Sequence, residues 1–191
     1  MGQHAIITHM SQLIGQGCGN GSNGCPEGLL IEKSFNSEDL AAYLVAQNTP
    51  VAGRAGFAAK FYGSPTKLTL PAGRLLEGNA FTIEFSMRTA AGVASTAVLL
   101  NYGEFTPGVA SPLTIAWSKF KGFYCSVTME DGSTVTSADG NAYNDGAWHF
   151  VACVYEEGSV KLYVDDSAAP EGSSQSSSQI LAGAGAGIVI G

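Results

Sequence analysis

The chain has 191 residues, with 9 basic and 16 acidic side chains and a formal net charge of −7. Nucleic acids and anionic membrane surfaces are bound by clustered Lys and Arg, so this charge argues against both kinds of partner. Hydrophobic residues make up 45% of the chain and charged residues only 13%, and glycine occurs 25 times. These values exclude a disordered chain and favour a β-rich domain of extracellular or particle-forming type.

Residues 1–28 differ in composition from the rest and are interpreted as an N-terminal arm, with a short strand predicted at residues 4–8. The arm has no Lys or Arg ahead of its apolar part, so it does not resemble a secretory signal peptide. No apolar run in the chain approaches the roughly 18 residues of a membrane span, so no membrane insertion is expected. Cys18 and Cys25 enclose a Gly- and Asn-rich loop, where a small disulfide and two free thiols fit the pattern equally well.

A single globular body is predicted over residues 29–191. It opens with a strand at residues 29–35 and one or two helical turns at residues 37–47, followed by short strands between residues 57 and 71. Residues 81–88 alternate strictly between apolar and polar side chains, which is the period-2 pattern of a half-buried strand. The buried face of this strand is expected to carry Phe81, Ile83, Phe85 and Met87.

The rest of the chain predicts a series of hairpins. Asp131-Gly132 lies between two alternating arms, which is a strong hairpin signal, and Glu157-Gly158 repeats the arrangement. Turn signals recur about every 8–12 residues among roughly ten strands with little helix, and this spacing predicts an antiparallel β-sandwich rather than a βαβ fold. Cys125 and Cys153 lie in apolar strand-like runs, where buried free thiols are favoured over a disulfide between them, since unpaired Cys behaves as a small hydrophobe.

Residues 144–151 read Asn-Asp-Gly-Ala-Trp-His-Phe-Val, and residues 155–165 read Tyr-Glu-Glu-Gly-Ser-Val-Lys-Leu-Tyr-Val-Asp. The pair resembles the Asp-Gly-x-Trp-His hairpin of the laminin-G-like, concanavalin-A-like lectin–glucanase family. Residues 59–71 and 81–87 are similar to two earlier stretches of that family, in the same order. The resemblance implies that the antiparallel sandwich is of jelly-roll type. It leaves the ligand open, because the family includes lectins, adhesion modules, pentraxins and domains attached to glycan-active enzymes.

Within the hairpin, Gly146 and Gly158 are expected to supply turns with positive φ. Trp148 is expected to fill part of a core layer between the two sheets, because its ring is large and apolar. The second strand of the hairpin is expected to alternate. Its inward positions would be Val160, Leu162 and Val164.

The family continues into a further strand that pairs with the first one, whereas this sequence ends at Gly191. The strand at residues 29–35 would then have an open edge, which is a template for another chain. We expect the arm, a neighbouring copy of the chain or residues outside this sequence to cover that edge. A homo-oligomer through the open edge or the arm is one consequence.

The sequence does not predict an enzyme. Glycosidases on this fold carry a Glu-x-Asp-x-x-Glu strand that aims two carboxylates into one cleft, and this pattern is absent. Glu84 is the lone acid of its strand. The acids at residues 156–157 and 165–166 are adjacent, so the members of each pair point to opposite faces or lie in a turn.

Calcium is the metal that the resemblance implies, since such domains often hold it in the loop after the first strand. Asn36, Glu38 and Asp39 occupy that loop and offer hard oxygen ligands. The alternative, and favoured, interpretation is a helix N-terminus in which Asn36 or Ser37 is the cap and the two acids complement the helix dipole. No cofactor is required.

A glycan site needs an exposed aromatic ring beside hydrogen-bonding groups. Trp117 shares the parity of apolar neighbours and is assigned to the core. Tyr124 lies on the polar face of its strand together with Ser126 and Thr128, so it is the strongest candidate for a ligand-facing ring. The further aromatic candidates are Tyr102 and Tyr143.

The leading hypothesis is therefore a non-catalytic recognition or adhesion module on a cell or virion surface. Its ligand is expected to be a glycan, with a surface protein as the other class of partner. The alternative is a structural subunit of a surface assembly such as a virion tail, fibre or pilus. An extracellular type of fold that begins at Met without a signal peptide, with few charges and an apolar last strand, favours this alternative.

Overall fold

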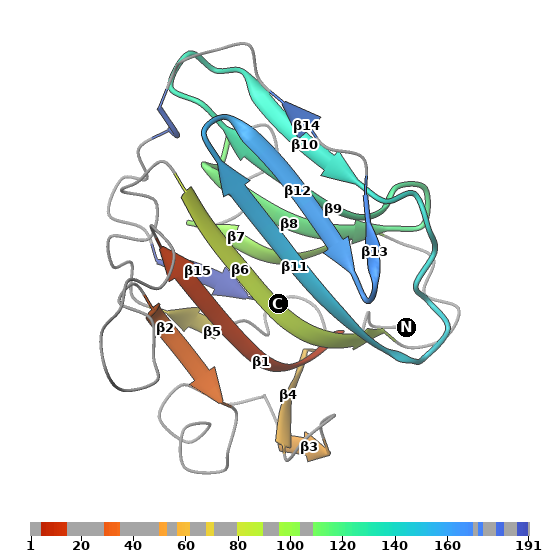
Figure 1. Ribbon diagram of the computed structural model, residues 1–191. Coiled ribbons are helices and arrows are strands. Elements are labelled where there is room, and N and C mark those ends of the chain that lie inside the picture. Colours follow the sequence, from red (N-terminus) through yellow and green to blue (C-terminus); the bar gives the residue numbers. More distant parts are fainter. Residues whose placement is uncertain are drawn as a thin grey trace, which may run out of the picture.

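The structure is a computed structural model that describes residues 5–14, 29–34, 50–52, 57–61, 68–70, 80–89, 96–103, 109–169, 172–173, 179–181 and 187–190. Every regular element in these ranges is a β-strand, and the strands form two sheets (Figure 1). Among the described residues there is no helix that is long and apolar enough to cross a membrane.

The first sheet has nine strands in the order β13-β12-β11-β6-β1-β4-β3, with β14 paired to β12 and β2 paired to β1. Its strands are β1 (Ala5–Ile14), β2 (Leu29–Ser34), β3 (Pro50–Ala52), β4 (Phe57–Phe61), β6 (Ala80–Thr89), β11 (Trp148–Glu156), β12 (Ser159–Val164), β13 (Ser167–Ala168) and β14 (Gly172–Ser173). We call it the nine-stranded sheet.

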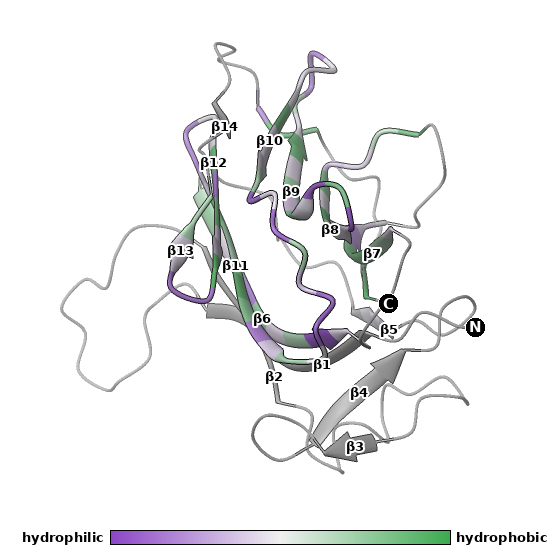
Figure 2. Ribbon diagram, turned by 90° about the vertical axis from the view of Figure 1, so that its right-hand side faces the viewer, coloured by the Kyte–Doolittle hydropathy of each residue, from purple (hydrophilic) through white to green (hydrophobic). Residues whose placement is uncertain are grey.

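The second sheet has six strands in the order β10-β9-β8-β7-β15-β5. Its strands are β5 (Leu68–Leu70), β7 (Ala97–Tyr102), β8 (Leu113–Ser118), β9 (Gly122–Thr128), β10 (Thr134–Ala138) and β15 (Ile188–Ile190). The strand pairs of both sheets are antiparallel. Figure 2 shows the two sheets from the side, as two layers. The predicted antiparallel β-sandwich is confirmed.

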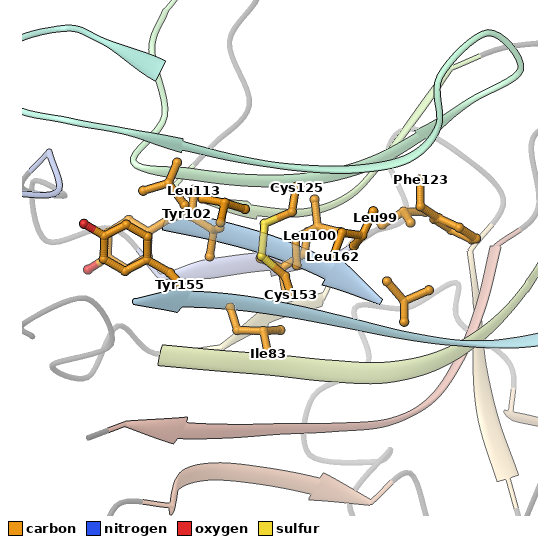
Figure 3. Packing of buried hydrophobic residues seen from close by; sticks show 14 of the residues in the cluster. Ile83, Leu99, Leu100, Tyr102, Leu113, Phe123, Cys125, Cys153, Tyr155 and Leu162 are labelled. Atoms are coloured by element: carbon orange, nitrogen blue, oxygen red, sulfur yellow. A yellow bond between two sulfur atoms is a disulfide. The ribbon is translucent and has the colours of Figure 1, made fainter. Parts of the chain in front are cut away.

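The hydrophobic core lies between the two sheets (Figure 3). From β6, Phe81, Ile83, Phe85 and Met87 are at most 2% exposed, which confirms the alternation predicted for this strand. Trp117 of β8 is fully buried, as its parity predicted. Each such side chain contributes about 1.5–3 kcal/mol by leaving water, so this layer is the main source of stability.

The hairpins form where the turn residues predict them. The β11–β12 turn has φ values of 46° at Glu157 and 85° at Gly158, and two consecutive positive φ values match the twist of the flanking strands. Gly132 in the β9–β10 turn has φ 82°, and Gly146 also has φ 82°. In β12, Val160, Leu162 and Val164 are buried, which confirms the predicted alternation.

The prediction of free thiols at Cys125 and Cys153 is wrong, because the two residues form a disulfide. Cys125 lies on β9 and Cys153 on β11, so the bond crosses the core and joins the two sheets (Figure 3). Both side chains are fully buried. The physical reason is that each strand turns its Cys toward the same core layer, which brings the two Cα atoms to 6.2 Å.

The prediction that Trp148 fills the core is also wrong. Trp148 is half-buried and lies outside the core cluster, whereas its neighbours His149 and Val151 face inward. Alternation along β11 therefore places Trp148 on the outer surface of the nine-stranded sheet. There the guanidinium carbon of Arg88, its cross-strand partner on β6, lies 5.1 Å from the centre of the Trp148 ring.

The strand predicted in the arm is longer than expected and lies inside the nine-stranded sheet. β1 pairs with β6 along its length, with β4 at residues 5–7 and with β2 at residues 9–13. The arm thus covers an edge of β2, which is one of the roles expected for it. The division of the chain at residue 28 stays a prediction. The predicted helical turns, and the pair Cys18 and Cys25, lie outside the described residues.

We expect the double variant Cys125→Ala/Cys153→Ala to lose about 3–4 kcal/mol of unfolding free energy, the chain-entropy value for a disulfide with a sequence separation of 28. Urea unfolding followed by Trp fluorescence measures this. Dithiothreitol should destabilise the wild-type chain and leave the double variant unchanged. Detection of both thiols as free in the denatured, unreduced wild-type chain would contradict the bridge.

Candidate functional site

One row of side chains crosses the six-stranded sheet on the surface turned away from the core. Each of the six strands contributes one residue, and cross-strand pairing places them side by side. In order across the sheet they are Thr69, Val189, Asn101, Thr114, Ser126 and Thr136. Five of the six are polar, so this surface offers a line of hydroxyl and amide groups.

These polar groups are hydrogen bonded to one another. The hydroxyls of Ser126 and Thr136 lie 2.8 Å apart. Thr114 Oγ1 donates to Asn101 Oδ1 at 2.7 Å, and Asn101 Nδ2 donates to the carbonyl of Gly103 at 3.0 Å. A hydroxyl has one donor and two acceptor positions, so Ser126 and Thr136 keep capacity for a ligand after pairing.

The exposure of this surface rises from the middle of the sheet toward its β10 edge. Asn101 is 1% exposed on β7, whereas Ser126 is half-buried on β9 and Thr136 is exposed on β10. The row is also exposed at Thr69 on the β5 edge, but the solvent-open part that carries an aromatic ring lies over β9 and β10. We call it the Tyr124 face; its members are Tyr124, Ser126, Thr134 and Thr136.

Tyr124 is the aromatic ring of this face. The ring is half-buried, and its cross-strand partners are the fully buried Ala116 on β8 and the half-buried Ala138 on β10. Lys121 Nζ lies 5.7 Å from the ring centre, within range of a cation–π contact. Burial raises the pKa of the Tyr124 hydroxyl above its usual value, so the hydroxyl stays protonated and is available as a donor.

The other predicted ligand-facing residues lie deeper. Thr128 is on the same side of β9 as Tyr124 and Ser126 but is only 5% exposed, and its hydroxyl lies 3.5 Å from that of Thr134. Tyr102 belongs to the core cluster and is 8% exposed (Figure 3). The structure thus brings Tyr124, Ser126 and Thr128 onto one strand face and places Tyr102 in the core.

Tyr143 is partly buried and packs against the core cluster. Its ring packs 5.0 Å from Phe123 and, edge-on, 4.7 Å from His149. Burial, together with a hydrogen bond and the negative charge of Asp139, raises the pKa of Tyr143 to about 12. The ring therefore has a packing role on two of its sides.

The candidate calcium ligands Asn36, Glu38 and Asp39 lie outside the described residues, and calcium stays a prediction. In the part of the chain that the structure does describe, no three His, Cys, Asp or Glu side chains are grouped so that they could hold a metal ion.

The structure gathers three ionisable residues of the hairpin that the sequence analysis did not connect. Asp145 Oδ1 lies 3.1 Å from His149 Nε2, and Asp165 Oδ2 lies 2.9 Å from His149 Nδ1. Because both ring nitrogens face a carboxylate, both can donate only when the ring is an imidazolium. Asp165 Oδ1 also accepts the backbone N–H of Phe150 at 2.9 Å, which ties the end of β12 to β11.

Protonation of this cluster follows from its geometry. Burial by itself lowers the pKa of His149, but hydrogen bonds and charge from Asp165 and Asp145 outweigh burial and hold the pKa above its usual value. The backbone N–H of Ala147, with a second contribution from His149, lowers the pKa of Asp145. The two carboxylates also accept the backbone N–H groups of Ala147 and Phe150, so the cluster ties the start of β11 to the end of β12, and we call it the clamp.

The outer surface of the nine-stranded sheet offers a second candidate region. Trp148 and Phe150 are half-buried there, and Tyr163 of the neighbouring strand is 36% exposed. Farther along the β11–β12 hairpin is a depression of about 260 Å³. Described residues that line it are Val154, Glu156, Glu157, Ser159 and Lys161.

The family model described as the concanavalin A-like lectin/glucanases superfamily matches residues 63–191, which is more than half of the chain. The chain therefore belongs to this superfamily, as its hairpin predicted. The solved structures that are similar include a CBM40 module of the IT-sialidase from Ruminococcus gnavus bound to α2,3-sialyllactose. That match has 17% sequence identity and a TM-score of 0.47, and covers 58% of this chain and 62% of the other. A search of curated protein sequences finds no match.

We expect the clamp to make stability depend on pH. The raised pKa of His149 means that its contribution is complete below the usual value of 6.5 and is lost as the pH rises through the raised value. The lowered pKa of Asp145 means that its contribution is present above 3.8 and is lost as the pH falls. Thermal unfolding from pH 5 to pH 9 should show the melting temperature falling on the alkaline side.

His149→Gln should flatten this alkaline dependence, because glutamine does not titrate. The matched control His4→Gln/His9→Gln removes the other two histidines and should keep the wild-type slope. Equal slopes in the wild-type chain and in His149→Gln would contradict the clamp.

Proposed function

We propose that this chain is a non-catalytic glycan-binding module and that the Tyr124 face is its binding surface. One observation carries the proposal: a Tyr124 ring flanked by two alanines stands beside paired hydroxyls on the open part of the six-stranded sheet. The chain's superfamily is described by its lectins and glucanases, so a carbohydrate ligand agrees with the family.

Sugar rings present an apolar C–H surface and a rim of hydroxyls. The Tyr124 ring supplies an apolar surface with a polar tip, which is the kind of side chain that aromatic binding sites use. The hydroxyls of Ser126, Thr134 and Thr136 line the strands beside it and both donate and accept. Tyr124 would stack on the sugar and the hydroxyl row would orient it.

The residues of the Tyr124 face support binding without hydrolysis. Glycosidases need two carboxylates on either side of the scissile bond. No Asp or Glu occurs among the residues assigned above to the row and to the Tyr124 face. Asp145 and Asp165 both contact His149, which leaves them engaged in the clamp.

A surface location is part of the proposal. Disulfides persist in oxidising compartments and are rare in reducing ones, and the Cys125–Cys153 bond supports an extracellular or virion-surface protein. A calcium ion held by Asn36, Glu38 and Asp39 is a further element of the proposal, which the family resemblance motivates.

The second candidate function is a structural subunit of a surface assembly. The half-exposed aromatic residues Trp148, Phe150 and Tyr163 favour it, because aromatic residues are enriched where protein surfaces meet. Sedimentation of the wild-type chain and of Trp148→Ser tests this candidate. A structural subunit should sediment as an oligomer in the wild-type chain, and Trp148→Ser should shift it toward monomers.

The proposed function is tested on a panel of immobilised neutral and acidic oligosaccharides. We expect Tyr124→Ala to lower the affinity for the bound glycan about tenfold, because it removes an aromatic contact of about 1.4 kcal/mol. Tyr163→Ala is the matched control on the opposite sheet and should bind as the wild-type chain does. Equal losses in the two variants, or no glycan bound by the wild-type chain, would overturn the proposal.

A further inference from the structure

The turn between β8 and β9 brings basic and aromatic side chains together on a chain with a net negative charge. It consists of Lys119, Phe120 and Lys121, so two of the chain's 9 basic side chains lie within three residues. Phe120 is 81% exposed. Lys119 Nζ lies 4.8 Å from the centre of the Phe120 ring.

The turn is held in one conformation. The backbone N–H of Lys121 donates to Ser118 Oγ at 3.0 Å, and the Lys121 carbonyl accepts the N–H of Gly140 at 2.9 Å. Gly122 has φ +65°, and a Cβ there would collide with the carboxylate of Asp139 and the backbone of Asn141. A preorganised surface loses less entropy on binding, so this turn is suited to recognition.

The turn continues the Tyr124 face. Lys121 follows Phe120 directly in the chain, and its ammonium group lies over the Tyr124 ring. Two ammonium groups thus each accompany an aromatic ring along one edge of the proposed glycan surface. One acid lies beside the turn: Asp139 lies against Gly122 and accepts the N–H of Asn141 at 3.2 Å.

We propose that Lys119, Phe120 and Lys121, together with Tyr124, form a subsite that selects glycans bearing a carboxylate or sulfate group. The inference rests on the proposed function and adds the class of sugar to it. An acidic sugar combines an apolar ring surface with a fixed negative charge, and aromatic rings next to ammonium groups match both. The net charge of −7 repels anions elsewhere, so a local positive turn also steers the orientation of the ligand.

An anionic lipid surface is the other kind of partner that a Lys-Phe-Lys turn could contact. Stable attachment to a membrane takes a larger apolar surface or a longer basic cluster than one ring and two ammonium groups. The glycan is therefore favoured, and vesicle binding becomes an outcome of the test.

The experiment compares neutral oligosaccharides with the same oligosaccharides carrying sialic acid, a uronic acid or sulfate. We expect the wild-type chain to bind at least one acidic member about tenfold more tightly than its neutral parent, with a preference that weakens as salt increases. Lys119→Gln/Lys121→Gln should bring the ratio of the two affinities close to one. The control Lys33→Gln/Lys60→Gln changes the net charge equally and should keep the wild-type ratio.

The possible contrary results separate a failure of the subsite from a failure of the proposed function. Equal affinity of the wild-type chain for neutral and acidic members would overturn the subsite and leave the proposed function standing. An unchanged ratio in Lys119→Gln/Lys121→Gln would also overturn the subsite. Absence of binding to any member would overturn both proposals. Sedimentation with phosphatidylserine vesicles that Phe120→Ser abolishes would assign the turn to membranes and overturn the glycan subsite.

Discussion

The Cys125–Cys153 bond is the constraint on which the arrangement of both surfaces depends. It fixes one residue of β9 and one of β11 toward the same core layer. Because side chains alternate along a strand, an inward Cys sets the direction of the other side chains of β9 and of β11. Tyr124 and Ser126 must then face outward from the six-stranded sheet, and Trp148 must face outward from the nine-stranded sheet. The candidate glycan surface therefore follows from the same alternation that builds the core.

Alternation could be predicted from the sequence where the two faces of a strand differ in polarity. In β6, apolar residues alternate with Thr82, Glu84 and Ser86, and the predicted core residues are buried. In β11 both faces are largely apolar, since Trp148, Phe150 and Val154 alternate with Val151, Cys153 and Tyr155. The period of two does not show which of two apolar faces points to the core. The large ring of Trp148 favoured the wrong face.

Contacts between strands that are far apart in the sequence could be identified only from the structure. Cys125 and Cys153 were recognised as buried, but only the facing positions of β9 and β11 show that they are bonded. Tyr124 could be predicted to point outward from its own strand, whereas the alanines beside it depend on the register of β8, β9 and β10. The family pattern contained Asp145, His149 and Asp165, yet their contact arises because the bend before β11 and the turn after β12 lie together at the open end of the hairpin.

The proposed function requires a glycan to bind to the outer surface of β9 and β10. Amide chemical-shift mapping by NMR, with the oligosaccharide that binds most tightly in the panel, tests it most directly. We expect the largest shifts at Tyr124, Ser126 and Thr136, and small ones across β11 and β12. Shifts concentrated at Trp148, Phe150 and Tyr163 would place the ligand on the opposite sheet and contradict the account.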